Sequence, residues 1–229
     1  MIDVKDCWLK ENCKQLHCSD PNGCLILFKL DYLYNQANVP LHLRKKLNLR
    51  LDADGTDYEQ FKTLKEIQDN IVDFVKNGNQ LLIHSVNCGS GKTSWALRLL
   101  QTYFNKIWLT SSLSCKALFI DVPTFLLAAK SNITSPNEYF NHVMSNVMDA
   151  DLVIFDDIGT KNSTVFEHEH LFSIINNRLS ANKTNIYTSN LTDSELQQAL
   201  GARLASRICN TSINIWFEGG DKRHLGKDI

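Results

Sequence analysis

The chain has 229 residues, of which 43% are hydrophobic and 21% are charged, and its formal net charge at pH 7 is −1. This composition is that of a globular protein, and the length suits one domain of ordinary size with a small appendage. The near-zero charge excludes an overall basic field for nucleic acid, so such a contact needs a local patch. No apolar run approaches the roughly 20 residues that span a bilayer, and residues 1–13 lack the basic start and apolar core of a signal peptide. We therefore expect a cytoplasmic protein without membrane contact.

The first segment of the chain is rich in cysteine, with four of the seven cysteines between positions 7 and 24. In a reducing compartment, clustered cysteines are metal ligands more often than disulfides. The spacing C-x5-C-x4-C-x5-C is wider than that of a usual zinc knuckle. Four thiolates can nevertheless close a tetrahedral Zn²⁺ site, which would stabilise a segment too short for its own core. We predict that Cys7, Cys13, Cys18 and Cys24 bind Zn²⁺; the alternatives are His17 in place of Cys18, or four unrelated thiols.

The rest of the chain alternates between predicted helices and strands. Residues 31–60 resemble a connector, in which the alternation of apolar and polar residues over 41–51 favours a short strand or an extended strap. Helical spacing of apolar residues predicts one helix from residue 61 to about 76. Buried strands are predicted over 80–85, 115–122, 151–159, 185–190 and 213–217, with helices near 95–104, 123–130, 136–148, 165–179 and 191–208. This order implies a parallel sheet with helices on both faces and ligands at the C-terminal strand ends.

The segment HSVNCGSGKTS, residues 84–94, lies between a predicted strand and a predicted helix. It ends like the phosphate-binding loop G-x-x-x-x-G-K-[ST], with Val86 in place of the first glycine. Lys92 would reach the outer phosphates and the Thr93 hydroxyl would ligate Mg²⁺, while the glycines let the backbone approach the phosphates. The predicted nucleotide-binding residues here are Asn87, Cys88, Gly89, Ser90, Gly91, Lys92, Thr93 and Ser94.

Two carboxylates directly follow the apolar strand LVIF. Asp156 is placed to hold Mg²⁺ through water and Asp157 to polarise an attacking water; a solvated acidic turn is the alternative. Asn190 ends another strand, where it could hydrogen-bond the attacking water or the γ-phosphate, or be an ordinary turn residue. Arg203 and Arg207 lie one helical turn apart, where an arginine could reach a neighbour's γ-phosphate or face solvent. The acid pair and the Gly-Lys-Thr loop together predict nucleotide binding.

In this order, the motifs NCGSGKTS, LVIFDDIG, NIYTSNLTDSEL and ARLASRI resemble the AAA+ ATPases of the bacterial replicative-helicase loaders, the DnaC/DnaI type, and the related IstB transposition helpers. The resemblance covers about residues 60–225. It implies an α/β AAA+ P-loop core without a C-terminal lid, and ATP and Mg²⁺ as cofactors. Hydrolysis is expected to be slow, because Asp157 stands where many AAA+ proteins have glutamate. The implied roles are Walker A for Lys92 and Thr93, Walker B for Asp156 and Asp157, sensor 1 for Asn190, arginine finger for Arg207 with Arg203 in reserve, and sensor 2 for Arg223.

Some Firmicute and phage loaders resemble this chain further, with a cysteine-rich N terminus before a stretch that here reads DYLYNQANVP. The resemblance implies a zinc-binding, helicase-docking module over 1–40, a linker over 41–60 and an AAA+ ATPase core over 61–229. The implied partners are a hexameric DnaB-type helicase, single-stranded DNA facing segment 123–140, and other copies of the chain. The implied setting is the bacterial cytoplasm, including that of a phage-infected host.

Two other functions remain open from the sequence. An IstB-like transposition helper would bind duplex DNA and a transposase, but the cysteine cluster argues against it. A phage adaptor would occupy a host replication protein without turnover, but the presence of Lys92, Asp156 and Asn190 argues against that role.

Overall fold

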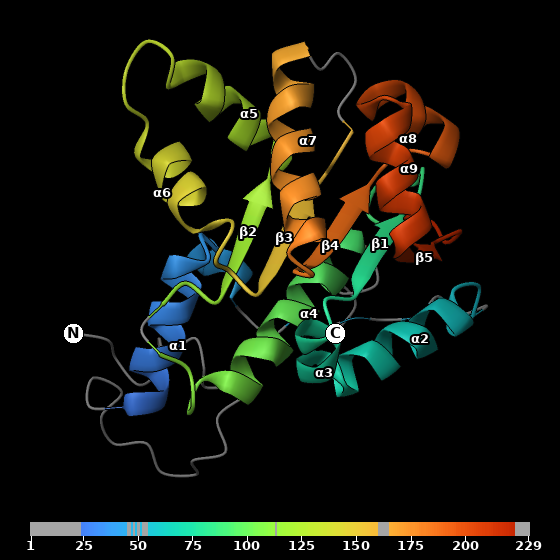
Figure 1. Ribbon diagram of the computed structural model, residues 1–229. Helices are drawn as coiled ribbons and strands as arrows, with labels where there is room; N and C mark the ends of the chain where they lie inside the picture. Colours follow the sequence, from blue (N-terminus) through green and yellow to red (C-terminus); the bar gives the residue numbers. More distant parts are fainter. Residues whose placement is uncertain are drawn as a thin grey trace.

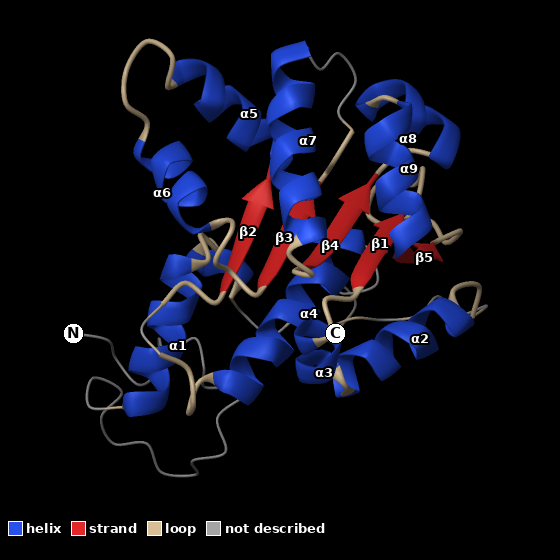
Figure 2. Ribbon diagram, viewed as in Figure 1, coloured by secondary structure: helices blue, strands red, loops and turns tan. Residues whose placement is uncertain are grey.

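The computed structural model describes residues 24–44, 47, 49, 51, 55–112, 114–159 and 165–222, with the backbone alone at 165–168. A five-stranded sheet lies at its centre, and every pair of neighbouring strands is parallel (Figure 1). The strands are β1 (Gln80–His84), β2 (Ala117–Asp121), β3 (Leu152–Asp156), β4 (Thr184–Ser189) and β5 (Ser212–Trp216), in the spatial order β2-β3-β4-β1-β5. The predicted parallel sheet with helices on both faces is confirmed (Figure 2).

Side chains that alternate along the strands divide the apolar interior into two cores. Leu81 and Ile83 of β1 belong to the first core, while Leu82 between them belongs to the second. Helices α1 (Leu25–Gln36), α2 (Tyr58–Asp69), α3 (Ile71–Lys76) and α4 (Lys92–Ile107) contribute to the first core. Helices α5 (Val122–Ser131), α6 (Glu138–Asn146), α7 (Val165–Ser180), α8 (Asp193–Leu200) and α9 (Ala202–Thr211) cover the other face. The result is a three-layer arrangement with the sheet in the middle.

A fully buried arginine fastens α7 to this second layer. Arg178 donates hydrogen bonds to Asn185 Oδ1 at 2.6 Å and to the carbonyls of Thr184, Val147 and Ala150. Burial lowers its pKa to about 10. The guanidinium therefore joins β4 to the turn before β3, which fixes the two strands whose ends form the site described below.

Helix α1 was not predicted, because its residues were assigned to a cysteine-rich segment and a connector. Leu27, Leu30 and Leu33 are buried on one side of it and belong to the first core. Just beyond the helix, the Ala37 carbonyl accepts a hydrogen bond from the Phe119 N–H at 2.8 Å and so covers the β2 edge. Residues 25–39 thus pack as part of the same body as the sheet.

The strand or strap predicted over residues 41–51 is wrong where the structure describes that stretch. Residues Leu41–Leu43 form a single 3₁₀ turn after Pro40. Arg44 then folds back, donating to Val39 O at 3.0 Å and to Asp31 Oδ1 at 2.7 Å. These side-chain contacts with α1 stabilise a turn that the apolar–polar alternation alone does not reveal.

Two predicted helices are each broken into a pair. The helix expected over 61–76 divides at Asn70, whose φ of −111° and ψ of 23° are not helical. The helix expected over 191–208 divides at Gly201, whose φ of 76° lies in the left-handed region that favours glycine. Within the described residues, no helix is long and apolar enough to span a membrane.

Candidate nucleotide-binding site

The loop between β1 and α4 has the backbone needed to surround a phosphate. Gly89 and Gly91 have φ angles of 75° and 100°, which residues with a side chain rarely adopt. Gly91 is the N-cap of α4 and supplies no side chain to cap the helix, so the backbone N–H groups of the first turn remain available for an anion. Val86, at the position of the missing first glycine, is 52% exposed and does not line the cleft. Its side chain therefore leaves the phosphate-facing part of the loop unchanged.

Lys92 begins α4 and its side chain returns under the loop. Only 7% of the residue is exposed. Its Nζ donates to Ser85 O at 3.2 Å, Asn87 O at 3.0 Å and Ser90 Oγ at 3.2 Å. The ammonium group is thus held at the centre of the loop, where it complements an anionic ligand.

Asp156 lies at the end of β3 and faces α4 across the cleft. Its Oδ1 accepts hydrogen bonds from Thr93 Oγ1 at 2.9 Å and from Thr188 Oγ1 at 2.6 Å. Burial raises the pKa of Asp156, and the two hydroxyl donors oppose that rise. A carboxylate beside a hydroxyl provides the hard oxygen ligands that Mg²⁺ prefers.

Asp157 has a backbone conformation unusual for a residue with a side chain, with φ at 57°. Its N–H donates to Thr188 Oγ1 at 2.9 Å, and its Oδ1 accepts from Asn190 Nδ2 at 2.6 Å. Such outliers cluster at functional sites when the surrounding contacts hold them in place. The two carboxylates therefore have different partners, hydroxyls for Asp156 and the Asn190 amide for Asp157, although Thr188 contacts both residues.

These groups line one cleft of about 360 Å³. Its walls are Cys88, Gly89, Ser90, Gly91, Lys92, Thr93, Ser94, Asp121, Asp156, Asp157, Thr188 and Asn190. The structure thus brings together the predicted Walker A, Walker B and sensor 1 residues. Asn87 is the exception within the loop, because its Nδ2 donates to Glu218 O at 3.0 Å and Gly219 O at 3.2 Å.

The remaining predicted residues lie elsewhere. Arg203 and Arg207 are on α9 and do not line the cleft. Arg223 and three of the predicted zinc ligands, Cys7, Cys13 and Cys18, lie outside the described residues. The fourth, Cys24, is the N-cap of α1, where its Sγ accepts from Leu27 N at 3.5 Å. Across the described ranges, no three His, Cys, Asp or Glu side chains gather as metal ligands.

Two cleft residues were missed from the sequence. Thr188 bridges the two acids, since its hydroxyl donates to Asp156 and accepts from the Asp157 N–H. Asp121 ends β2 and pairs in register with Asp156. Both could have been found from their position, because polar residues at the C-terminal ends of neighbouring parallel strands meet at one edge of the sheet.

The residues after β5 support the back of the loop, and no sequence pattern indicated this. The Lys222 N–H donates to Gly89 O at 3.0 Å, and the Asp221 carboxylate lies so close to Gly89 that an added Cβ would be 2.1 Å from it. Lys222 Nζ also pairs with Asp57 Oδ2 at 2.6 Å. Asp57 is fully buried and accepts from the Glu218 N–H at 2.9 Å. We call residues 217–222 the C-terminal strap.

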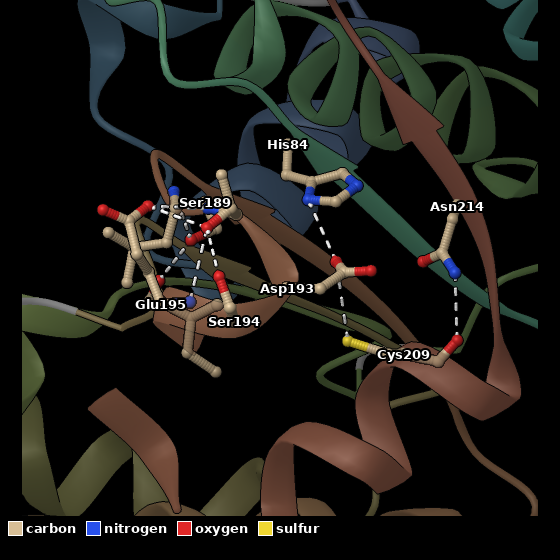
Figure 3. Close-up of polar contacts among 10 residues, drawn as sticks. His84, Ser189, Asp193, Ser194, Glu195, Cys209 and Asn214 are labelled. Carbon is tan, nitrogen blue, oxygen red and sulfur yellow. Dashed lines mark hydrogen bonds and ion pairs between the residues drawn. The ribbon is translucent and has the colours of Figure 1, made fainter. Parts of the chain in front are cut away.

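A polar cluster that includes His84, Asp193 and Cys209 lies at the end of β1 (Figure 3). His84 Nδ1 is 3.7 Å from Asp193 Oδ1, and the Cys209 thiol approaches the same oxygen at 4.0 Å. The His84 ring contacts Trp216 edge to face. Burial lowers the pKa of His84 against the opposing effects of Asp193 and the Leu191 backbone. The imidazole is therefore neutral near pH 7, and its contact with Asp193 is not an ion pair there.

No family sequence model matches the chain, and no curated protein sequence matches it. Solved structures do. The DnaC helicase loader superposes with a TM-score of 0.59 at 18% identity, over 80% of this chain and 99% of that one. The DnaI structure superposes with a TM-score of 0.58 at 18% identity, over 83% of this chain and 93% of that one. The replication initiator DnaA bound to AMPPCP and single-stranded DNA gives 0.55 at 20% identity, over 73% of this chain and 48% of that one.

These structures share the fold of this chain, in which helices flank a five-stranded parallel sheet. The chain spans about half the length of the AMPPCP-bound DnaA structures and nearly all of the DnaC and DnaI structures. The resemblance to helicase loaders that the motifs indicated is thus confirmed at the level of the fold.

Proposed function

We propose that the chain is a Mg²⁺-dependent ATPase that loads a hexameric DnaB-type replicative helicase onto single-stranded DNA. The observation that supports this function best is the cleft itself. The hydroxyls of Thr93 and Thr188 donate hydrogen bonds to Asp156, and the Asn190 amide donates one to Asp157. All of these residues line one cleft with Lys92. This chemistry occurs on the fold of the DnaC and DnaI loaders.

The residues present fit a magnesium nucleotide. The uncapped N terminus of α4 and the Lys92 ammonium suit phosphate oxygens, and the Thr93 hydroxyl with the Asp156 carboxylate suits Mg²⁺. When bound, the ion would neutralise the charge of the outer phosphates. Cys88, Ser90 and Ser94 complete the wall of the cleft around them.

Within this proposal, the chain's own groups divide the work of hydrolysis. Asp157 polarises the attacking water, and Asn190 fixes the direction of its carboxylate through the 2.6 Å hydrogen bond. Arg207 acts on a neighbouring copy, since it does not line its own cleft. Arg203 is the second candidate for that role, and Arg223 remains the proposed sensor 2. Hydrolysis would loosen an ATP-dependent assembly and release the helicase.

The N-terminal module is the proposed helicase-docking part, with Zn²⁺ held by Cys7, Cys13, Cys18 and Cys24. Cys24 starts α1, which is packed into the body, so a metal-clamped segment would be joined rigidly to the core. Elemental analysis of protein purified without added metal should give one zinc per chain. A content near zero with an intact fold would remove zinc from the proposal.

A helicase-loading assay on a single-stranded circle, with purified DnaB-type helicase and the full-length chain, tests the function. Wild type should load helicase in the presence of ATP, while Lys92→Ala should not bind ATP and Asp157→Asn should bind it without turnover. Lys106→Ala is the matched control, since this α4 lysine contacts the Asp69 carbonyl away from the cleft and should behave as wild type.

The alternatives predict different outcomes. Preference for duplex DNA with no helicase binding would favour the transposition helper. Helicase binding that is equal in wild type and Lys92→Ala, without loading, would favour the adaptor.

A further inference from the structure

Two arginines on α9 share one aromatic ring on α7. The guanidinium carbon of Arg203 is 5.3 Å from the centroid of the Phe172 ring, and that of Arg207 is 5.4 Å from it. Both distances are within the range in which a cation is attracted to the face of a ring. A single ring that contacts two cations one helical turn apart restricts the direction in which both side chains leave the helix.

The ring is itself held in place. Phe172 packs against the second core, and Leu204 and Ile208 bury the neighbouring side of α9 in the same core. Arg203 is exposed and Arg207 is half-buried, so both leave a helix whose buried side is fixed. Where the structure describes side chains, no carboxylate pairs with either guanidinium, so Phe172 is the group that orders them.

The surroundings suit a protein surface better than nucleic acid. Arg203 lines a hollow of about 330 Å³ whose exposed walls are mostly apolar and include Phe172, Leu200 and Leu204, with the charged residue Glu169 also among its lining residues. Apolar side chains with aromatic and arginine residues are typical of protein interfaces. The acidic cleft at the strand ends offers charge of the opposite sign to these cations, so a second copy of the chain is the occupant that the charges favour.

We propose that Phe172 is a positioning residue that holds Arg203 and Arg207 ready for the nucleotide of an adjacent copy. This inference rests on the proposed ATPase and extends it, because it assigns the orientation of the arginines to a ring that contacts no nucleotide. Without the ring, the flexible arginine side chains spend more time in other rotamers, and the rate falls while nucleotide affinity does not.

The test compares Phe172→Leu with Phe172→Tyr, which keeps the ring. Phe140→Leu is the matched control, since it removes another ring of the same core, one that packs against Phe125 and His170, while the arginines lie over Phe172. We expect Phe172→Leu to lower the hydrolysis rate about tenfold, from a cation–π contribution of this order, with unchanged affinity for a fluorescent ATP analogue. Phe172→Tyr and Phe140→Leu should keep the rate within about twofold of wild type on the same basis.

A mixing experiment separates positioning from folding. The Lys92→Ala protein should bind no nucleotide but has correctly oriented arginines, while the Phe172→Leu protein binds nucleotide. Mixing the two should therefore restore hydrolysis of the ATP bound to Phe172→Leu. The inference would be overturned if the mixture did not recover hydrolysis, or if Phe172→Leu hydrolysed ATP at the wild-type rate while Arg207→Ala was slow. Neither result would contradict the proposed ATPase activity. A wild-type hydrolysis rate for Arg207→Ala would overturn both the arginine-finger role of Arg207 and this inference. Loss of DNA binding by Phe172→Leu with an unchanged rate would assign the arginines to DNA instead.

Discussion

At the scale of single residues, Asp156 is a buried carboxyl group, and its burial in the folded protein disfavours its ionisation. Burial raises its pKa above the ordinary value of 3.8, so between the two pKa values the folded chain binds more protons than the unfolded chain. The stability from this group is present at low pH and is lost as the pH rises through that window. At neutral pH, before any cation binds, the ionised carboxylate therefore lowers the stability of the protein.

We accordingly expect Asp156→Asn to raise the melting temperature of the nucleotide-free protein at pH 7.5, by an amount that shrinks toward pH 4. The amide oxygen can still accept from Thr93 and Thr188, while the charge that would hold Mg²⁺ is gone, so hydrolysis should be lost. Thermal melting with and without Mg²⁺–ATP measures both effects, with the exposed Asp149→Asn as control. A lower melting temperature than wild type would contradict this account.

His84 should produce the opposite dependence on pH. Its folded pKa is lowered by burial, so the unfolded chain takes up a proton first as the pH falls. Its stabilising effect is complete above the unfolded pKa of about 6.5 and is lost as the pH falls below that value toward the folded pKa. His84→Gln should therefore lose less melting temperature than wild type between pH 7.5 and pH 5.5. The exposed His42→Gln is the control, and equal losses in wild type and His84→Gln would refute the prediction.

At the scale of elements, local sequence predicted those parts whose chemistry is local. A magnesium nucleotide needs a glycine-rich loop with a lysine for its phosphates and acids at a strand end for the metal ion. Lys92 with its neighbouring glycines and the acids after the strand LVIF match this need, so the sequence predicted most residues of the cleft. Thr188 was missed because its role depends on hydrogen bonds to a different strand.

The missed elements depend on distant packing. Helix α1 falls partly in the predicted cysteine-rich segment and partly in the predicted connector. Apolar residues occur on most of its sides, and only the first core shows which of them are buried. The 3₁₀ turn at residues 41–43 depends on the contacts of Arg44 with α1. The C-terminal strap depends on Asp57, far away in the sequence. None of these contacts leaves a periodic signal in the chain.

The C-terminal strap gives the prediction at this scale. Asp57 is fully buried and accepts hydrogen bonds from Lys222 and from the Glu218 and Gly219 N–H groups, so Asp57→Ala removes the acceptor that these three donors share. Breaking such a pair costs about 3–5 kcal/mol in the free energy of unfolding. Because the strap also contacts Gly89, ATP should bind more weakly.

Denaturant unfolding and nucleotide titration measure these two effects. The exposed Lys65–Asp69 pair on α2 is the matched control, and Lys65→Ala should cost only about 0.3–0.5 kcal/mol. Equal costs for the two substitutions would show that the strap is not fastened through Asp57.

At the scale of the whole molecule, the division into a module over 1–40, a linker over 41–60 and a core over 61–229 stays a prediction. The packing of α1 shows what a truncation must respect. Leu27, Leu30, Leu33 and Tyr34 are all buried in the core shared with α4 and β1. Removing four such side chains forfeits roughly 1.5–3 kcal/mol each, a total comparable with the 5–15 kcal/mol by which a typical protein is stable.

Two truncations should therefore behave differently. Deleting residues 1–23 should leave a folded protein that binds ATP with wild-type affinity and fails to bind helicase, because the proposed docking segment is gone while α1 remains. Deleting residues 1–40 should also lower the melting temperature sharply, since α1 is removed from the core. Calorimetry, nucleotide titration and helicase pull-down on both proteins, beside the full chain, make the comparison. If the 1–23 deletion still loads helicase, docking belongs to the rest of the chain; if both deletions melt alike, α1 is not part of the core that the structure describes.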